Sequence, residues 1–181
     1  MPTTVQITVY KFDELPEEAQ EKAIEKLWDL NVDHDWWDSI YEDAKEIGLE
    51  ITGFDTYRKT ISGKLNEFLL DSCKAIRKNH GVSCDTFKTA KDYLLTYIAA
   101  FNKWRNVKEN GYDHWKWVDW LAEFKYSDEA QEIEDDYKKA LLEDYLSILC
   151  KECDYQTSTD QIIESIRAND YNFTLEGLIF N

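Results

Sequence analysis

One short stretch of the chain combines the side chains used by metal sites, by acid–base catalysis and by docking surfaces. Residues 32–48, VDHDWWDSIYEDAKEIG, hold six carboxylates together with His34, Trp36 and Trp37. The candidate metal ligands in the stretch are Asp33, His34, Asp35, Asp38, Glu42 and Asp43. His34 and Asp38 have the i, i+4 spacing that places two ligands on one helix face. The stretch therefore poses four alternatives: a metal site, an acid–base pair, an ordinary amphipathic helix, or a face that docks on a basic partner.

The patterns that accompany metal sites are missing. The chain has no HExxH motif and no calcium-binding loop of the EF-hand type, and His80 and His114 bring no second ligand set. Cys150 and Cys153 form a CxxC pair, but Cys73 and Cys84 are eleven residues apart, which does not complete a four-cysteine zinc pattern. We therefore expect no metal, no cofactor and four reduced thiols.

Catalytic motifs are missing as well. The sequence contains no GxSxG, no P-loop and no GxGxxG, and none of its three histidines accompanies a nucleophile motif. With 37 acidic residues in the chain, some carboxylates must lie close together, so closeness alone does not indicate an acid–base pair. We expect that the protein is not an enzyme.

Acidic residues recur at helical spacing in two regions, and these rows are the candidate partner-binding surface. The first row is Asp35, Asp38, Glu42 and Glu46; the second is Asp128, Glu132, Asp135 or Asp136, and Glu143. One helical turn is about 5.4 Å, near the spacing of phosphates along a nucleic-acid strand. Such rows suit docking on a basic surface of a nucleic-acid-binding protein, with Trp36 and Trp115 as aromatic anchors. A solvated helix face explains the same spacing and stays open.

The charge is large and unevenly distributed. The net charge of −16 divides into −11 over residues 1–56, +7 over residues 57–108 and −12 over residues 109–181. The basic middle contains the candidate DNA-binding residues Arg58, Lys59, Lys64, Arg77 and Lys78. They either form a patch for double-stranded DNA or counterbalance the acidic segments within the fold, and the second interpretation is favoured.

The hydrophobic pattern predicts an α+β fold in one domain spanning residues 1–181. We expect helices over residues 16–30, Asp35–Ile47 with Gly48 as C-cap, Leu69–His80, Thr86–Arg105, 115–124, a helix capped by Ser127 and running to about Cys153, and Asp160–Ala168. We expect strands at Val5–Phe12, at Leu49–Phe54 paired with Lys59–Leu65 as a hairpin, and at Tyr171–Phe180. The predicted sheet is small and antiparallel, draws strands from both chain ends and packs against several helices.

Neither a membrane span nor a signal peptide is indicated. No apolar run approaches the roughly 20 residues of a spanning helix, and the N-terminus lacks a basic region followed by an apolar one. These features predict a cytoplasmic protein without a membrane partner.

Several segments resemble a family of small acidic proteins from phages, prophages and plasmids. The likeness lies in FDELPEEAQEKA at residues 12–23, in DxDWWDxxYEDAKEIG at 33–48, in ITGFD at 51–55 and in the tail from Tyr155 to Gly177. Members of that family often have the label of antitoxin of a toxin–antitoxin stability system. The chain is also similar to type II anti-CRISPR proteins, which inhibit Cas9.

The resemblance implies a protein partner but transfers no individual site residue. It implies an anti-CRISPR protein that acts in the bacterial cytoplasm by binding Cas9 or the Cas9–guide RNA complex. The acidic and aromatic surface would make this contact, and the basic middle segment would provide a candidate contact to double-stranded DNA. The alternative is an antitoxin that neutralises a partner toxin by direct binding.

Overall fold

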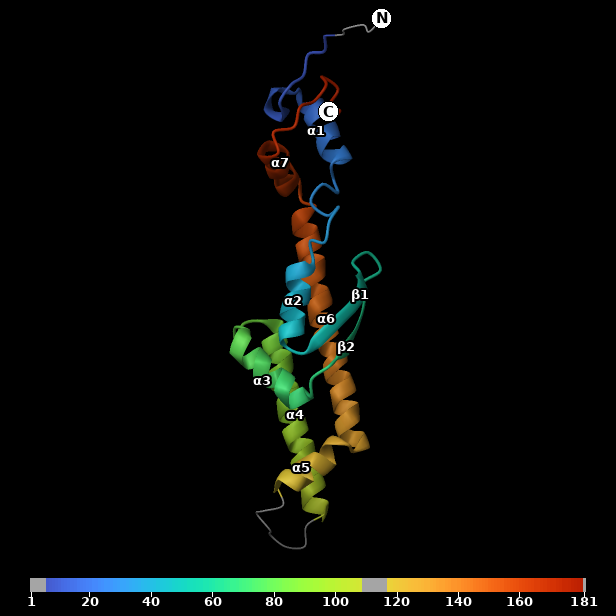
Figure 1. The fold of residues 1–181 in the computed structure, drawn as a ribbon, viewed down its shortest axis with the longest axis vertical. Coiled ribbons are helices and arrows are strands. Elements are labelled where there is room, and N and C mark those ends of the chain that lie inside the picture. Colours follow the sequence, from blue (N-terminus) through green and yellow to red (C-terminus); the bar gives the residue numbers. More distant parts are fainter. Residues whose placement is uncertain (1–5, 109–116, 181) are drawn as a thin grey trace, which may run out of the picture. The chain divides into compact units, whose positions relative to one another are not determined.

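The computed structural model describes residues 6–108 and 117–180, which form helices and one β-hairpin (Figure 1). In chain order the elements are a 3-10 helix at Phe12–Glu14, α1 Glu17–Lys26, α2 Asp38–Glu46, β1 Leu49–Asp55, β2 Thr60–Leu65, α3 Leu69–Asn79, α4 Asp85–Lys108, α5 Trp117–Lys125, α6 Asp128–Gln156 and α7 Thr159–Ala168. The chain divides into two compact units. The terminal unit comprises Met1–Trp36 and Lys151–Asn181, and the central unit comprises Trp37–Cys150.

The terminal unit has its own apolar core beneath α1 and α7. The core residues are Phe12, Leu15, Ala19, Ala23, Ile162, Ile166 and Phe173. Ala19 and Ala23 lie one turn apart on α1, and Ile162 and Ile166 have the same spacing on α7, so each helix buries one face. The hydroxyl of Ser158 accepts a hydrogen bond from the Gln161 N–H and caps α7.

The predicted strands at the chain ends are wrong for the described residues. Tyr10 and Phe173 exchange both backbone hydrogen bonds, at 2.9 and 2.8 Å, and Phe173 forms a second bridge with Ile179. These are isolated bridges, because a 3-10 helix begins at Phe12 and a turn follows Phe173. The alternating apolar pattern predicted strands, but pairing stops after one residue at each bridge.

The central unit contains the sheet, which therefore comes from the middle of the chain. β1 and β2 pair antiparallel from Leu49 opposite Leu65 to Asp55 opposite Thr60, with an irregularity between Ile51 and Gly53. The predicted hairpin and the α+β class are confirmed. Gly48 has φ +83° directly after α2, which confirms its predicted role in ending that helix.

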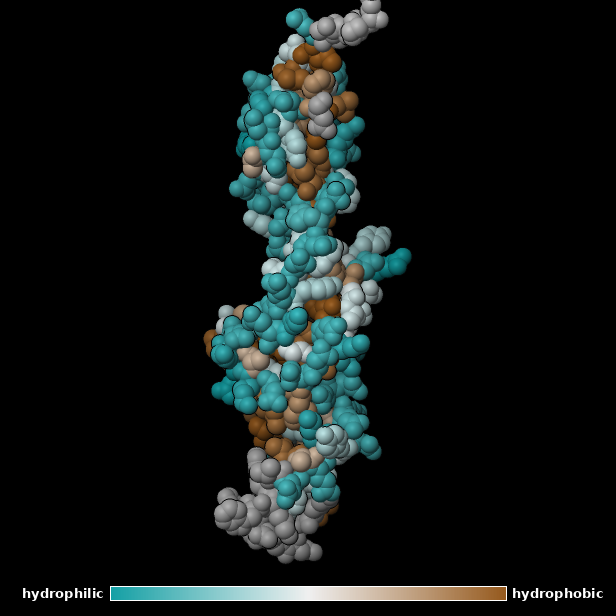
Figure 2. All heavy atoms as spheres, viewed as in Figure 1, coloured by the Kyte–Doolittle hydropathy of each residue, from teal (hydrophilic) through white to brown (hydrophobic). Residues whose placement is uncertain are grey.

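Helices α2 to α6 and the hairpin enclose the core of the central unit. Its most buried large side chains include Ile47, Leu49, Leu69, Ile76, Tyr97, Phe124, Tyr137, Leu141, Tyr145 and Leu149. The Tyr137 hydroxyl lies 3.0 Å from the Ser72 hydroxyl, so this polar group is satisfied inside the core. In Figure 2 hydrophilic residues cover most of the visible face, interrupted by apolar patches.

Two helix starts show where local sequence rules succeed and fail. Ser127 was predicted to cap α6, and its hydroxyl accepts a hydrogen bond from the Ala130 N–H at 3.2 Å. α2 was predicted to begin at Asp35 but begins at Asp38. The Trp36 N–H donates to the carbonyl of His34, at 2.8 Å, and this tight turn is incompatible with a helix at those residues.

A carboxyl group between α4 and α6 should make stability depend on pH. Asp144 accepts a hydrogen bond from the Thr89 hydroxyl at 2.7 Å. Burial raises the pKa of Asp144, although the Thr89 hydrogen bond opposes the shift. Since the folded chain then holds this proton more tightly than the unfolded chain does, stability decreases as the pH rises above the ordinary value of 3.8.

We therefore expect Asp144→Asn to increase the free energy of unfolding at pH 7 by more than it does at pH 4. Urea unfolding at both pH values measures the difference. The control is Glu132→Gln, at an exposed position on the same helix, which should change the free energy of unfolding by the same small amount at both pH values. An Asp144→Asn effect that is independent of pH would contradict the role of burial.

Candidate functional site

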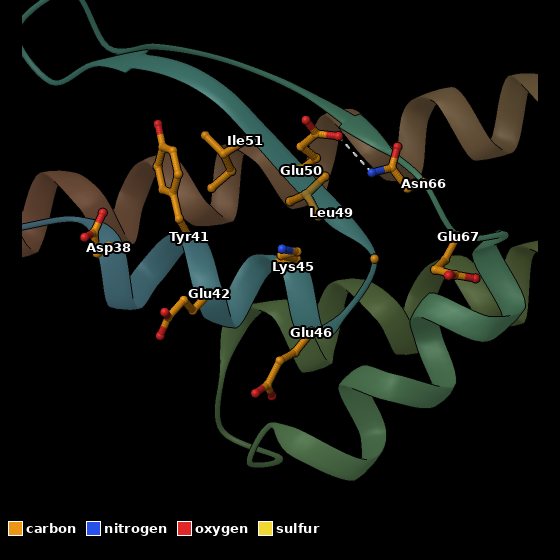
Figure 3. Close-up of a pocket in the computed structure, with 11 residues that line it drawn as sticks. Asp38, Tyr41, Glu42, Lys45, Glu46, Leu49, Glu50, Ile51, Asn66 and Glu67 are labelled. Carbon is orange, nitrogen blue, oxygen red and sulfur yellow. Dashed lines mark hydrogen bonds between the residues drawn. The ribbon is translucent and has the colours of Figure 1, made fainter. Parts of the chain in front are cut away.

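An open hollow of about 630 Å³ lies in the central unit beside α2, and it is strongly acidic. Its acidic lining residues are Asp38, Glu42, Glu46, Glu50 and Glu67, against a single lysine, Lys45. The partly exposed Tyr41 lines the hollow together with the buried Leu49 and Ile51, and Figure 3 shows these three side chains between α2 and β1. The hollow therefore combines concentrated negative charge with one partly exposed aromatic ring.

Helical periodicity positions the carboxylates of α2. Asp38, Glu42 and Glu46 follow each other at intervals of four residues and are all exposed. Such neighbours lie about 6 Å apart along a helix, and their mutual repulsion costs a few tenths of a kcal/mol per pair. In Figure 3 Glu42 and Glu46 extend from the side of α2 away from β1. A basic partner that approached this face would relieve the repulsion.

The other acidic residues of the hollow come from outside α2. The Asn66 side chain donates a hydrogen bond to Glu50 Oε2 at 2.9 Å, which holds that carboxylate at the rim (Figure 3). Glu67 follows β2 and lies close to Gly48, where any added Cβ would meet the Glu67 side chain. Neither residue was singled out from the sequence, because only the packing of the hairpin beside α2 brings them to the hollow.

Asp43 has a different role from the neighbouring carboxylates of α2. Its Oδ2 accepts a hydrogen bond from the Tyr145 hydroxyl at 2.7 Å, and its Oδ1 lies 3.5 Å from Nε2 of the buried His80 side chain. Burial, reinforced by the bond to Asp43, raises the pKa of Tyr145, so the phenol stays protonated and donates. His80 Nδ1 in turn lies 2.7 Å from the Thr86 hydroxyl. This network joins α2, α4 and α6 and serves the fold.

Helix α2 does not include Asp35, the predicted first member of the row, or Trp36, the predicted anchor. Both residues precede the helix and belong to the terminal unit; Asp35 is exposed and Trp36 is partly buried. The predicted four-member row is therefore a three-member row. Trp115, the second predicted anchor, lies outside the described residues.

The second acidic row lies on α6, as predicted. Asp128, Glu132, Asp135 and Asp136 are all exposed, and Asp128 and Glu132 are one turn apart. Asp135 pairs with Lys138 at 2.6 Å on the same helix, which reduces the local charge. Asp135 and Asp136 lie three and four residues after Glu132, so both flank the face of α6 on which Glu132 lies.

The structure distributes the candidate DNA-binding residues over separate elements. Arg58 and Lys59 lie in the hairpin turn beside the fully exposed Tyr57, whereas Lys64 lies on β2 opposite Glu50. Arg77 and Lys78 occupy the last turn of α3.

Several ion pairs of the basic segment are local. Arg58 lies 3.8 Å from Asp55, Lys74 lies 3.4 Å from Asp71 and Lys88 lies 2.8 Å from Asp85. All three pairs have i, i+3 spacing, so they neutralise charge within short stretches of chain. Binding of double-stranded DNA by this segment stays a prediction.

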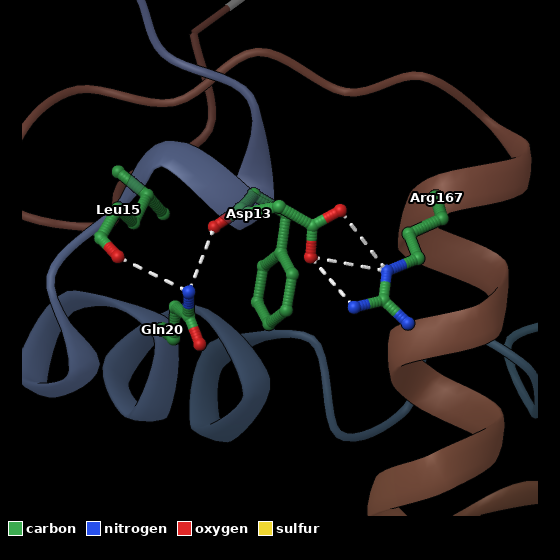
Figure 4. Close-up of polar contacts among 5 residues, drawn as sticks. Asp13, Leu15, Gln20 and Arg167 are labelled. Carbon is green, nitrogen blue, oxygen red and sulfur yellow. Dashed lines mark hydrogen bonds and ion pairs between the residues drawn. The ribbon is translucent and has the colours of Figure 1, made fainter.

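A polar cluster in the terminal unit is satisfied by the chain itself (Figure 4). Arg167 Nη2 and Nε donate to the Asp13 carboxylate at 2.6 and 3.2 Å, and the Gln20 amide donates to the carbonyls of Phe12 and Leu15. These contacts tie α7 and α1 to the 3-10 helix. They are structural contacts rather than a second candidate site.

Residues 6–108 and 117–180 contain no group of three or more histidine, cysteine, aspartate or glutamate side chains arranged to hold a metal ion. Over the same part of the chain no helix is long and apolar enough to cross a membrane. The cysteines are free thiols, with Cys73 buried and Cys84 exposed. Comparisons with protein-family models, with curated proteins and with solved structures found no match to this chain.

Proposed function

We propose that this chain is a non-catalytic inhibitor encoded by a phage or mobile element, and that it binds Cas9 in the bacterial cytoplasm. The observation that carries the proposal is the hollow beside α2, which five carboxylates and one lysine line together with Tyr41. The choice of Cas9 rests on the resemblance to anti-CRISPR proteins described above.

The chemistry of the hollow matches the surface that such a partner offers. Cas9 holds its guide–target heteroduplex in a positively charged channel and reads the PAM with arginines. Exposed carboxylates one helical turn apart would meet those side chains, and the charge would accelerate association. The partly exposed ring of Tyr41 would add contact area that salt does not screen. Inhibition would then follow from occupying surface that nucleic acid needs.

Co-elution with guide-loaded Cas9 tests the proposal. We expect a complex on a sizing column at about 0.1 M salt and a weaker one at about 0.5 M, since ions at that concentration screen exposed charge contacts. Absence of a complex at both concentrations would reject Cas9 as the partner. The antitoxin alternative then predicts a stoichiometric complex with the product of a neighbouring gene.

Neutralising the α2 face should weaken the complex. The triple variant Asp38→Asn, Glu42→Gln and Glu46→Gln removes three exposed charges, each worth about 0.2–1 kcal/mol, so we expect the dissociation constant to rise about tenfold. Binding of labelled Cas9–guide RNA at low salt, followed by anisotropy, measures it.

A matched control distinguishes the effect of the position of the removed charges from the effect of the total charge of the protein. Glu18→Gln, Glu21→Gln and Glu25→Gln remove the same charge from exposed residues of α1, in the terminal unit, and should leave the affinity within about twofold of wild type. Equal losses in both variants would show that only net charge matters. Unchanged affinity of the α2 variant would exclude the α2 face from the mechanism.

A further inference from the structure

A second hollow, between the end of α3 and the first half of α4, has the opposite character. It measures about 690 Å³ and its apolar lining is Val82, Phe87, Leu94 and Leu95. Val82 and Leu95 are 76% and 57% exposed, although both are aliphatic. In Figure 2 apolar surface interrupts the hydrophilic surface over α3 and α4. Exposed aliphatic side chains gathered in a hollow are typical of a binding surface.

The polar lining of this hollow is mainly basic. Arg77, Lys88 and Lys91 line it together with a single carboxylate, Asp92. Lys88 forms an ion pair with Asp85, whereas Arg77 and Lys91 have no ion-pair partner among the described residues. Two cations thus remain for a ligand, in a chain whose net charge is −16. Because these two cations lie beside apolar side chains, a matching ligand would carry both acidic and apolar groups.

The spacing of the α4 residues indicates the shape of that ligand. Lys88, Lys91 and Leu95 follow at i, i+3 and i+7, so two cations and then an aliphatic side chain lie in sequence along one helix face. Val82 lies in the α3–α4 connection, and Arg77 on the last turn of α3, so the hollow has walls on two sides. An amphipathic helix that placed its apolar residues between these walls would direct acidic flanks toward the cations.

A protein segment fits this surface better than nucleic acid does. Aliphatic residues supply three of the four apolar side chains, whereas surfaces that bind single strands present aromatic rings for base stacking. A second copy of the chain would bring its own charge of −16 and repel the first.

We propose that the α3–α4 hollow is a docking site for an acidic amphipathic helix of a partner protein. The partner helix has aliphatic residues at i, i+3 or i+4 and glutamates or aspartates beside them. The site is separate from the acidic hollow beside α2 and does not depend on the function proposed above.

Selection from a random library of displayed peptides tests the proposal with the full-length chain as bait. Peptides of about 15 residues span roughly four helical turns, enough to fill the hollow. We expect the enriched peptides to combine acids with aliphatic residues at helical spacing. Recovery of no peptide, or of peptides without acids, would overturn the proposal.

Three variants show where the selected peptides bind. Leu95→Asp and Lys91→Glu should each weaken peptide binding at least tenfold, an effect of about 1.4 kcal/mol. Val107→Asp, on the same helix roughly 18 Å away, adds the same charge as Leu95→Asp at another exposed apolar residue and should change binding less than twofold. Circular dichroism checks that each variant folds. We expect all three to fold, because the substituted residues are exposed. Equal binding by Leu95→Asp and wild type would overturn the proposal.

A nucleic-acid arm distinguishes the competing class of ligand. Labelled single-stranded and double-stranded oligonucleotides are titrated with wild type, Lys91→Glu and Leu95→Asp. We expect no binding at about 0.15 M salt. Binding that Lys91→Glu abolishes and Leu95→Asp preserves would identify the surface as a phosphate contact and overturn the helix-docking proposal.

Discussion

Replacing Gly177 with alanine should destabilise the terminal unit by about 3 kcal/mol, a large effect for the addition of one methyl group. Gly177 has φ +80°, a conformation that costs a residue with a side chain roughly 1–2 kcal/mol. A Cβ at this position would also overlap the carbonyl oxygen of Ala19, on the buried side of α1. Backbone cannot rotate away as a flexible side chain does, so either α1 or the C-terminal turn must move.

Hydrogen exchange in increasing urea measures this effect in each unit. In Gly177→Ala, amides of α1 and α7 should lose protection at lower urea, while those of α3 and α4 keep theirs. The control is Gly81→Ala: Gly81 is exposed, and the nearest atom to an added Cβ is the Cys84 sulfur at 3.8 Å. In Gly81→Ala the amides of all four helices should be protected as in wild type. Unchanged protection of α1 and α7 in Gly177→Ala would contradict the close approach to Ala19.

Local sequence rules predicted most of the helices and the hairpin. The predicted hairpin strands, Leu49–Phe54 and Lys59–Leu65, differ from β1 and β2 by one residue at one end each. The signals act within a few residues: alternation in the strands, helical periodicity in α7 and glycine after α2. Such signals survive in the fold because each element buries the face that its own pattern defines.

Contacts between distant residues account for what the sequence did not predict. The extended segment at Tyr10 has the composition of a strand, yet its pairing with Phe173 ends after one residue. Whether a strand continues depends on the length of its partner, and the partner lies at the other end of the chain. Local periodicity contains no information about that length.

The candidate site divides in the same way. Asp38, Glu42 and Glu46 were recognised from their spacing, which the helix preserves. Glu50 and Glu67 were not, because the packing of β1 against α2 and the course of the chain after β2 bring them there. Periodicity also could not separate Asp43 from its neighbours, since its partners Tyr145 and His80 are distant in sequence.

Phe124 connects α5 to α4, and its replacement by alanine should cost the central unit about 3–5 kcal/mol. The side chain is fully buried, and its ring centroid lies 5.1 Å from that of Tyr97 and 5.6 Å from those of Phe101 and Trp104. Alanine would remove apolar burial and three aromatic contacts together.

Urea unfolding, followed by tryptophan fluorescence and by hydrogen exchange in α4, measures this loss. Phe124→Leu should recover part of it, because leucine refills part of the volume but makes no ring contact. Tyr126→Ala is the matched control: this aromatic residue lies two positions away but is 73% exposed, and its loss should cost less than about 0.5 kcal/mol. If Phe124→Ala and Tyr126→Ala cost the same, the ring cluster does not hold α5 on α4. A large loss in Phe124→Ala alone would show that it does, because only Phe124 is buried against the rings of α4.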